Sequence, residues 1–163
     1  MKKAASLFLP TGRAAEASVG VLAAGLLLAG LAPAQAGKAA VESLSVTDAW
    51  FRTIVPDRPA GGYFTLRNES GRPRTMTGVS SPACGMAMMH ETAEESGVAK
   101  MRRVQRIEVP AHGSITFAPG GRHIMCMKPT DAMAPGGTVP VKLEFADGTS
   151  LTADFAVKSA SGE

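Results

Sequence analysis

The sequence predicts an all-β domain, an antiparallel sandwich or barrel, that follows an N-terminal export signal. From Val41 onward the chain is divided into short apolar-rich runs separated by glycine, proline and asparagine, which is typical of such folds. No stretch has a convincing helical period. About 127 residues follow residue 36, a length that suits one domain with a real hydrophobic core. We therefore expect a single domain at 37–163, with an ordered core at about 44–157.

The first 36 residues have the pattern of a signal peptide. Three basic residues precede an uncharged stretch at 17–33, and Ala34-Gln35-Ala36 follows it, so we expect cleavage after Ala36. An uncleaved membrane anchor is the alternative, but the stretch is shorter than the roughly 20 residues that a spanning helix needs and it ends at a proline. No cysteine follows the stretch to receive a lipid. The mature protein is expected to be soluble in the periplasm.

The charge balance and the residue inventory exclude several function classes. Without residues 1–36 the chain has 14 basic and 13 acidic residues and no run of like charges, which argues against nucleic acid as a partner. The sequence has only three histidines, no phosphate-cradling glycine motif and no zinc-hydrolase helix. We therefore expect a protein that is not an enzyme.

Nine strands are expected after the signal, each bounded by turn residues. They lie at 44–54, 62–68, 75–80, 86–92, 101–109, 114–118, 123–127, 138–145 and 150–157. The clearest hairpin joins the last two strands, because Val141, Leu143 and Phe145 alternate with polar neighbours before Asp147-Gly148, a dipeptide suited to the positive φ angles of a tight turn. The turns before the sixth and seventh strands contain proline and glycine.

Histidine and methionine recur with a regular spacing in the second half of the chain. His90 is followed after ten residues by Met101, and after a further twenty-one residues by His123, Ile124 and Met125. A thioether is a soft, uncharged donor and imidazole also suits copper, so two of each favour Cu(I) over zinc, magnesium or calcium. Strand alternation would place His123 and Met125 on one face and Ile124 on the other.

The same alternation applies to the earlier strand. Met86, Met88 and His90 would share a face, with His90 at the exposed end of the strand, and Met127 would continue the ligand face on the later strand. The charged residues 91–100 are expected to form an exposed loop, after which Met101 returns beside His90. Methionines that fill a core and histidines that lie on the surface are the alternative. However, seven of the eight methionines after the signal lie between residues 86 and 133, which favours a shared site.

The chain resembles the periplasmic PCu(A)C copper chaperones in this spacing and in the segments VTDAWFR, AGGYFTLRN and PGGRHIMCM. The resemblance implies a cupredoxin-like antiparallel β-sandwich with Greek-key connections. It implies that the Cu(I) ligands are His90, Met101, His123 and Met125. It also implies delivery of copper to the copper-site subunit of respiratory cytochrome oxidases, alongside Sco-type thiol proteins. Because neutral donors should hold Cu(I) less tightly than the two thiolates of an acceptor, we expect the transfer to proceed by ligand exchange. We expect a monomer that meets the membrane only through its acceptor.

Two residue types depart from the family pattern. Cys126 stands where an aliphatic residue is usual and Cys84 is also unusual, whereas His112 replaces a frequent glycine in a turn and is expected at the surface. In an exported protein two cysteines are most simply a disulfide. Buried free thiols remain open, as does a role for Cys84 as an auxiliary copper ligand.

Two other functions remain open besides delivery. One is copper buffering for tolerance, with no oxidase as acceptor. The other is a blue-copper electron carrier, which would use two histidines, a cysteine thiolate and a weak axial methionine. Cys126 is poorly placed for that role, because alternation turns it away from His123.

Overall fold

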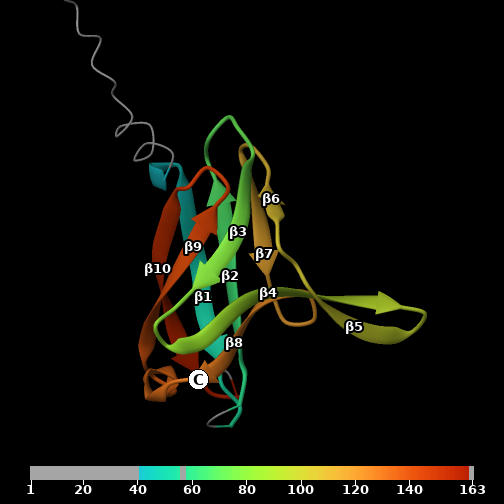
Figure 1. Ribbon diagram of the computed structural model, residues 1–163, viewed down its shortest axis with the longest axis vertical. Coiled ribbons are helices and arrows are strands. Elements are labelled where there is room, and N and C mark those ends of the chain that lie inside the picture. The colour runs from blue at the N-terminus through green and yellow to red at the C-terminus, as the bar shows by residue number, and fades with distance from the viewer. Residues whose placement is uncertain (1–40, 56–57, 162–163) are drawn as a thin grey trace, which may run out of the picture. The chain divides into compact units, whose positions relative to one another are not determined.

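The computed structural model describes residues 41–55 and 58–161, and these form ten strands and one short 3₁₀ helix (Figure 1). The expected signal peptide at 1–36 lies outside the described residues. The elements are β1 (Leu44–Arg52), β2 (Ala60–Asn68), β3 (Arg74–Ser80), β4 (Cys84–Glu95), β5 (Val98–Arg103), β6 (Ile107–Val109), β7 (Gly113–Phe117), β8 (Arg122–Pro129), η1 (Asp131–Met133), β9 (Thr138–Phe145) and β10 (Ser150–Lys158).

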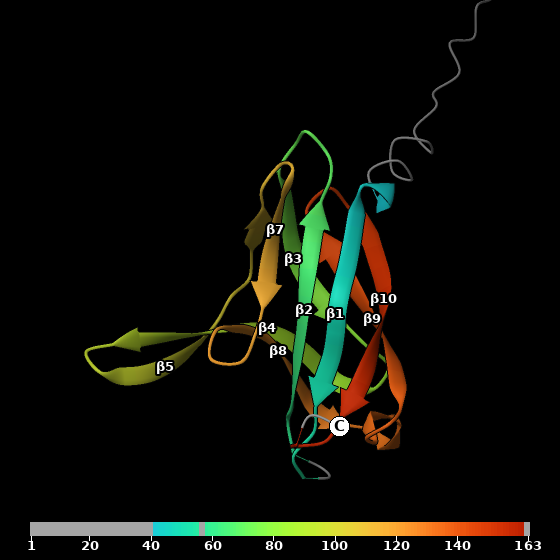
Figure 2. The same ribbon diagram turned by 180° about the vertical axis from the view of Figure 1, so that it is seen from behind.

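The strands pair in the order β5-β4-β8-β2-β1-β10-β9-β3-β6, and β7 also pairs with β2. Figures 1 and 2 show how this continuous sheet folds over itself, with β1, β2 and β7 on one side and β3 and β9 on the other. Besides the pairs of consecutive strands, strands distant in sequence also pair, such as β4 with β8 and β1 with β10, as in Greek-key sandwiches. The expected all-β, mostly antiparallel single domain is confirmed. One pairing differs, because β1 and β10 run parallel.

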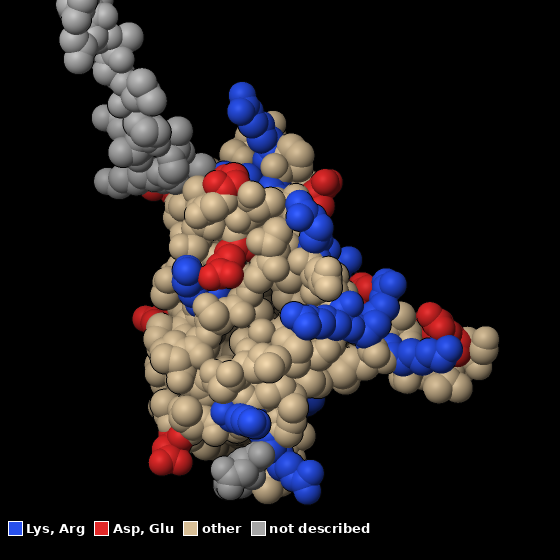
Figure 3. All heavy atoms as spheres, in the orientation of Figure 1, with Lys and Arg blue, Asp and Glu red and all other residues tan. Residues whose placement is uncertain are grey.

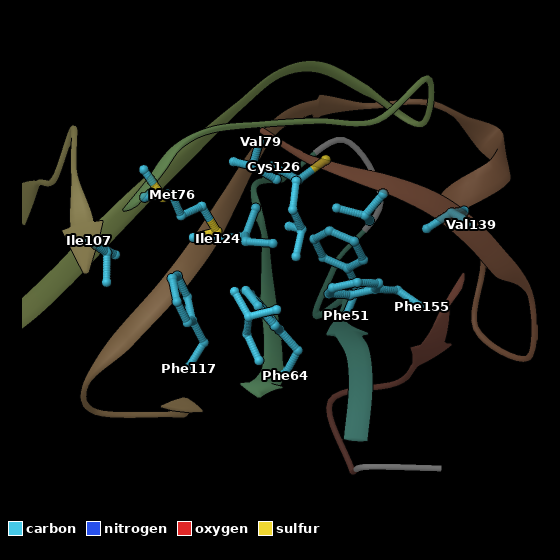
Figure 4. Packing of buried hydrophobic residues seen from close by; sticks show 14 of the residues in the cluster. Phe51, Phe64, Met76, Val79, Ile107, Phe117, Ile124, Cys126, Val139 and Phe155 are labelled. Atoms are coloured by element: carbon cyan, nitrogen blue, oxygen red, sulfur yellow. The ribbon is translucent and has the colours of Figure 1, made fainter. Parts of the chain in front are cut away.

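The core lies between the two sides of the folded sheet (Figure 4). On β9 the apolar residues alternate with exposed ones, so that Val139, Val141 and Leu143 are all buried, as the sequence pattern predicts. The Phe64 ring stacks on Phe117 with centroids 4.4 Å apart and also meets Phe155 at 5.5 Å. This packed interior gives the outward-facing side chains of neighbouring strands a rigid base.

Asn68 is a buried polar residue at the end of β2. Its Nδ2 donates to the carbonyl oxygens of Arg72 (2.8 Å), Pro110 (3.0 Å) and Val109 (3.3 Å). Its Oδ1 accepts from both the backbone N–H and the hydroxyl of Ser70. One side chain thereby ties the turn after β2 to the turn between β6 and β7, and satisfies backbone groups that the sheet leaves unpaired.

The expected strand at 101–109 is wrong, because it is two strands with different partners. β5 pairs with β4, whereas β6 pairs with β3 on the other side of the domain. Between them the chain leaves the edge of β4 at Val104, whose N–H still donates to the carbonyl of Met89.

The expected exposed loop at 91–100 is also wrong. β4 continues to Glu95 and turns through Ser96 and Gly97, whose φ angles are 55° and 78°, the positive values that a two-residue hairpin turn requires. β4 and β5 therefore form a hairpin, called the arm below, whose outer part projects from the sandwich (Figure 1). Every residue of β5 is exposed to solvent. Because neither face of this strand is buried, it needs no apolar residues and can have the polar composition of a loop.

The final hairpin is confirmed, but its turn has a different geometry. Of Asp147 and Gly148, the glycine takes a positive φ of 81°. The Gly148 N–H donates to the carbonyl of Phe145, and the Phe145 N–H donates to the carbonyl of Thr149. A loop of four residues therefore joins β9 to β10.

Candidate metal centre

The pairing of β4 with β8 brings the sequence-predicted donors together. In this antiparallel pair His90 lies opposite His123, Met88 opposite Met125, and Met86 opposite Met127. Alternate residues of a strand share a face, so these six side chains stand on one face as three neighbouring cross-strand pairs. We call them the donor ladder. Met89 and Ile124 lie between them in sequence and are buried on the opposite face, as predicted.

The two imidazoles lie within reach of one metal ion. Their ring centroids are 5.9 Å apart with the planes inclined by 42°, and metal–imidazole bonds of about 2 Å can bridge such a separation. His123 is 8% exposed, and its Nδ1 lies 3.0 Å from the carbonyl oxygen of Gly121. When Nδ1 carries the proton, it donates to that carbonyl, and the lone pair of Nε2 stays free to bind a metal ion. A backbone carbonyl is a usual partner for the second ring nitrogen of a metal-binding histidine.

The turn before β8 places this carbonyl. Gly120 has a φ of 81°, and the N–H of Gly121 closes the turn on the carbonyl of Ala118. The carbonyl of Gly121 also accepts from the N–H of Thr92 on β4, at 3.2 Å. The proline-glycine turn expected from the sequence therefore orients the His123 ring as well as reversing the chain.

His90 has an unused nitrogen. Its Nδ1 is buried, and no hydrogen-bond partner for it exists in the described part of the chain. Burial lowers the pKa of His90 below its usual value, and the neighbouring His123 and Arg103 lower this pKa further. The imidazole is thereby held in the neutral form that a metal ion requires. A buried nitrogen without a partner calls for an explanation, and a bound metal ion would provide one.

Met101 stands apart from the other three predicted ligands. It lies on β5 opposite Thr92, whereas Arg103 lies opposite His90. Met101 therefore shares a face with His90 but lies diagonally from it, on the side away from Met125, and it is 54% exposed. That His90, Met101, His123 and Met125 together bind one ion stays a prediction. His90 itself lies within β4, five residues before its end, and not at the end of a strand as expected.

Met88 is a candidate donor that the sequence did not single out. It lies directly opposite Met125 and next to the imidazole pair, and it is partly buried. The alternation of Met86, Met88 and His90 placed it on the correct face, but the pairing register needed to set it against Met125 comes only from the structure. Thioethers and neutral imidazoles form a set of soft, uncharged donors that fits Cu(I).

The opposite face of the same strands carries an ion-pair cluster. Glu91 on β4 accepts from Arg102 on β5 at 2.8 Å and faces Arg122 on β8 at 3.3 Å. The hydrogen bond from Arg102 is the main reason that the pKa of Glu91 lies below its usual value. Figure 3 shows basic side chains around the base of the arm. The cluster joins the three strands that carry the predicted ligands.

Cys84 and Cys126 form a disulfide with a Cα–Cα distance of 5.3 Å. Of the three states considered from the sequence, the structure therefore has the bridged one. Cys126 is fully buried in the core (Figure 4). Because both sulfurs are bonded to each other, Cys84 cannot serve as an auxiliary thiolate ligand, and the thiolate of a blue-copper centre is not available either.

Other parts of the described chain lie away from this chemistry. A cleft of about 670 Å³ is lined by residues 53–55 after β1, by the last residue of β8 together with η1, and by residues 159–161, and no histidine borders it. His112 is exposed with a φ of 51°, which agrees with its expected place in a surface turn. Within residues 41–55 and 58–161, no helix has the length and apolar character needed to cross a membrane.

Known proteins resemble this chain in sequence and fold. The model of the LpqE-like family, described as "Putative lipoprotein LpqE-like", matches residues 44–157. The "Putative lipoprotein Lxx21020" of Leifsonia xyli subsp. xyli (strain CTCB07) is 27% identical over 132 residues, which cover 80% of this chain and 79% of that protein. Both descriptions name lipoproteins, a class of exported proteins.

Two solved structures also resemble the domain. The copper-bound PCuAC domain from PmoF2 has 25% identity and a TM-score of 0.60, with 74% of this chain and 96% of that one covered. The solution structure of CuI-DR1885 from Deinococcus radiodurans has 31% identity and a TM-score of 0.57, with 76% and 85% covered. These matches confirm the resemblance seen in the sequence: the chain belongs to the LpqE-like family, and its domain is of the PCuAC type.

Proposed function

We propose that this protein is an exported Cu(I)-binding chaperone that hands copper to an acceptor by ligand exchange. The observation that carries the proposal is the direct opposition of His90 and His123 on β4 and β8, with Met125 in the adjacent pair. The two copper-loaded relatives support the choice of metal, since one is a copper-bound PCuAC domain and the other contains Cu(I). Copper is the cargo in this proposal, and the protein performs no catalytic reaction.

Each residue has a physical role in holding the cargo. The carbonyl of Gly121 fixes the ring of His123, and burial keeps His90 neutral. Met125 adds a thioether, and Met101 on the arm adds another from the exposed side. None of these donors carries a charge, so the bound ion keeps its own positive charge and remains attractive to anionic thiolates of an acceptor.

Release then proceeds by donor exchange. Acceptor thiolates replace the thioethers one at a time, beginning with the exposed Met101, and no proton has to be supplied to a leaving thioether. The proposed acceptors are the copper-site subunit of a respiratory cytochrome oxidase and a Sco-type thiol protein. The proposed form is a monomer, soluble in the periplasm after cleavage behind Ala36, that meets the membrane only through its acceptor. Cell fractionation tests this location, since a lipid-anchored protein would remain with the membranes.

The test of the site is competition with a colorimetric Cu(I) chelator under reducing, anaerobic conditions. Wild type is expected to bind Cu(I), and His90→Ala and His123→Ala are each expected to weaken binding at least tenfold. His112→Ala is the matched control, because this histidine is exposed in a turn away from the donor ladder. Equal loss in all three variants, or none in any, would show that the imidazole pair is not the site.

Delivery needs its own test, because copper buffering would use the same site. Copper-loaded protein is mixed with a copper-free acceptor domain that has thiol ligands. The two proteins are then separated, and the copper in each one is measured. In cells, a deletion strain is expected to lose oxidase activity and to regain it with wild type but not with His90→Ala/His123→Ala. Normal oxidase activity together with copper sensitivity would favour buffering and overturn delivery.

A further inference from the structure

Beyond the imidazole pair, the donor ladder consists of four methionines. Met88 and Met125 form the next cross-strand pair, and Met86 and Met127 form the one after it. The methionines that fill the core of this domain are different, because Met76, Met89 and Met133 are each no more than 5% exposed. In contrast, Met86 is 56% exposed, and Met88, Met125 and Met127 are only partly buried. Core filling therefore does not account for the four thioethers on this face.

The register places the four side chains around a common point. Directly opposite Cβ atoms in an antiparallel pair lie about 5 Å apart, and alternate residues along a strand lie about 7 Å apart. The four Cβ atoms thus outline a rectangle whose centre is about 4 Å from each corner. Each sulfur lies two bonds beyond Cβ on a flexible side chain, and a metal–sulfur bond adds about 2.3 Å. All four sulfurs can therefore reach one ion above the centre.

The chemistry of this set selects the ion. Thioether sulfur is soft and neutral, whereas calcium and magnesium need several oxygen ligands. The ladder itself contains no carboxylate at any of its six positions. The donors therefore fit a soft monovalent cation such as Cu(I).

We propose that Met86, Met88 and Met127 form a second Cu(I) position, made of thioethers only, which shares Met125 with the imidazole position. The proposal rests on the proposed Cu(I) function for the identity of the metal, but it concerns different residues. Met125 can turn toward either position, so an ion can pass between them with the exchange of one donor at a time. The second position extends the path from the buried His123 to the exposed Met86, where an acceptor can reach it.

The first experiment counts bound ions in the mature protein. Wild type titrated with Cu(I) is expected to bind two equivalents. His90→Ala/His123→Ala is expected to retain one equivalent with a sulfur-only coordination shell in X-ray absorption. Met86→Leu/Met88→Leu/Met127→Leu, which keeps side-chain volume, is expected to retain one equivalent with both nitrogen and sulfur ligands. Met133→Leu is the control for replacement of a methionine outside the ladder, and it is expected to bind two.

A second measurement needs no substitution and so does not depend on whether a variant folds. The methyl groups of methionine are labelled with carbon-13, and their NMR signals are followed as Cu(I) is added to wild type. The signals of Met86, Met88 and Met127 are expected to shift with the second equivalent, and those of Met76 and Met133 to stay in place.

The outcomes separate this inference from the proposed function. One equivalent in wild type and none in the double histidine variant would overturn the second position and leave the imidazole site intact. Two equivalents in the triple methionine variant, or unmoved methyl signals of Met86, Met88 and Met127, would also overturn it. No binding at the imidazole pair, with one equivalent retained on the methionines, would instead overturn the proposed site and support this one.

Discussion

Removal of the Cys84–Cys126 disulfide is expected to destabilise the domain strongly without removing any proposed copper donor. The bridge joins residues 42 apart in sequence. For a loop of that length the chain-entropy relation gives about 13 cal/mol/K, or about 4 kcal/mol at room temperature, through restriction of the unfolded chain. Small domains are stable by only about 5–15 kcal/mol, so the loss is a large fraction of the total.

The assay is urea denaturation of the mature protein in three forms. These are the oxidised wild type, the wild type reduced with a phosphine, and Cys84→Ala/Cys126→Ala. The reduced protein keeps both sulfur atoms, so its loss of about 4 kcal/mol reports the cross-link. The double variant should lose somewhat more, because Cys126 is fully buried and its sulfur leaves a small cavity.

Two results would refute this reasoning. A loss below about 1 kcal/mol on reduction would show that the entropic effect of the loop is not realised in this protein. Loss of Cu(I) binding in a double variant that is still folded would show that a cysteine sulfur contributes to the site after all. Folding is checked by circular dichroism before each copper titration.

Four further predictions concern other side chains. Cu(I) affinity should fall as the pH drops below about 6.5, because protonated imidazole does not bind a metal, and chelator competition across that range should show no such fall in His90→Ala/His123→Ala. The lowered pKa of His90 means that the folded state binds fewer protons there than the unfolded chain, so this group should also reduce the stability of the metal-free protein as the pH falls below about 6.5. Glu91→Gln should cost less than about 1 kcal/mol in urea denaturation, because its ion pairs are near the surface, and a larger loss would mean that the cluster supports the arm. Asn68→Ala should cost about 2–4 kcal/mol, because several buried backbone groups lose their partner, and an unchanged denaturation midpoint would contradict the role given to this residue.

Alternation along a single strand could be predicted from the sequence, and it placed several residues correctly. His123 and Met125 face one way while Ile124 is buried, because a strand has a period of two. The same rule placed Met86, Met88 and His90 on one face.

The pairing of strands could not be predicted in the same way. A shift of β4 against β8 by two residues keeps every side chain on its face. Alternation alone therefore does not determine which residue of β4 lies opposite Met125. The arm was missed for a related reason. A hairpin exposed on both faces has no apolar stripe, and its turn residues Ser96 and Gly97 stand among charged residues whose composition is typical of a loop. The parallel pairing of β1 with β10 depends on packing between segments far apart in the chain.

The outer edge of the arm has a consequence for self-association. β5 is the last strand of the sheet in the described part of the chain, so one row of its backbone N–H and C=O groups has no strand partner among residues 41–55 and 58–161. Such a row can template β-aggregation with a second molecule. Lys100, Arg102 and Arg103 make half of this short strand cationic, and their long, hydrated side chains hinder the approach of another edge of the same kind. Charge on this edge therefore disfavours β-aggregation at the strand that carries the exposed thioether of Met101.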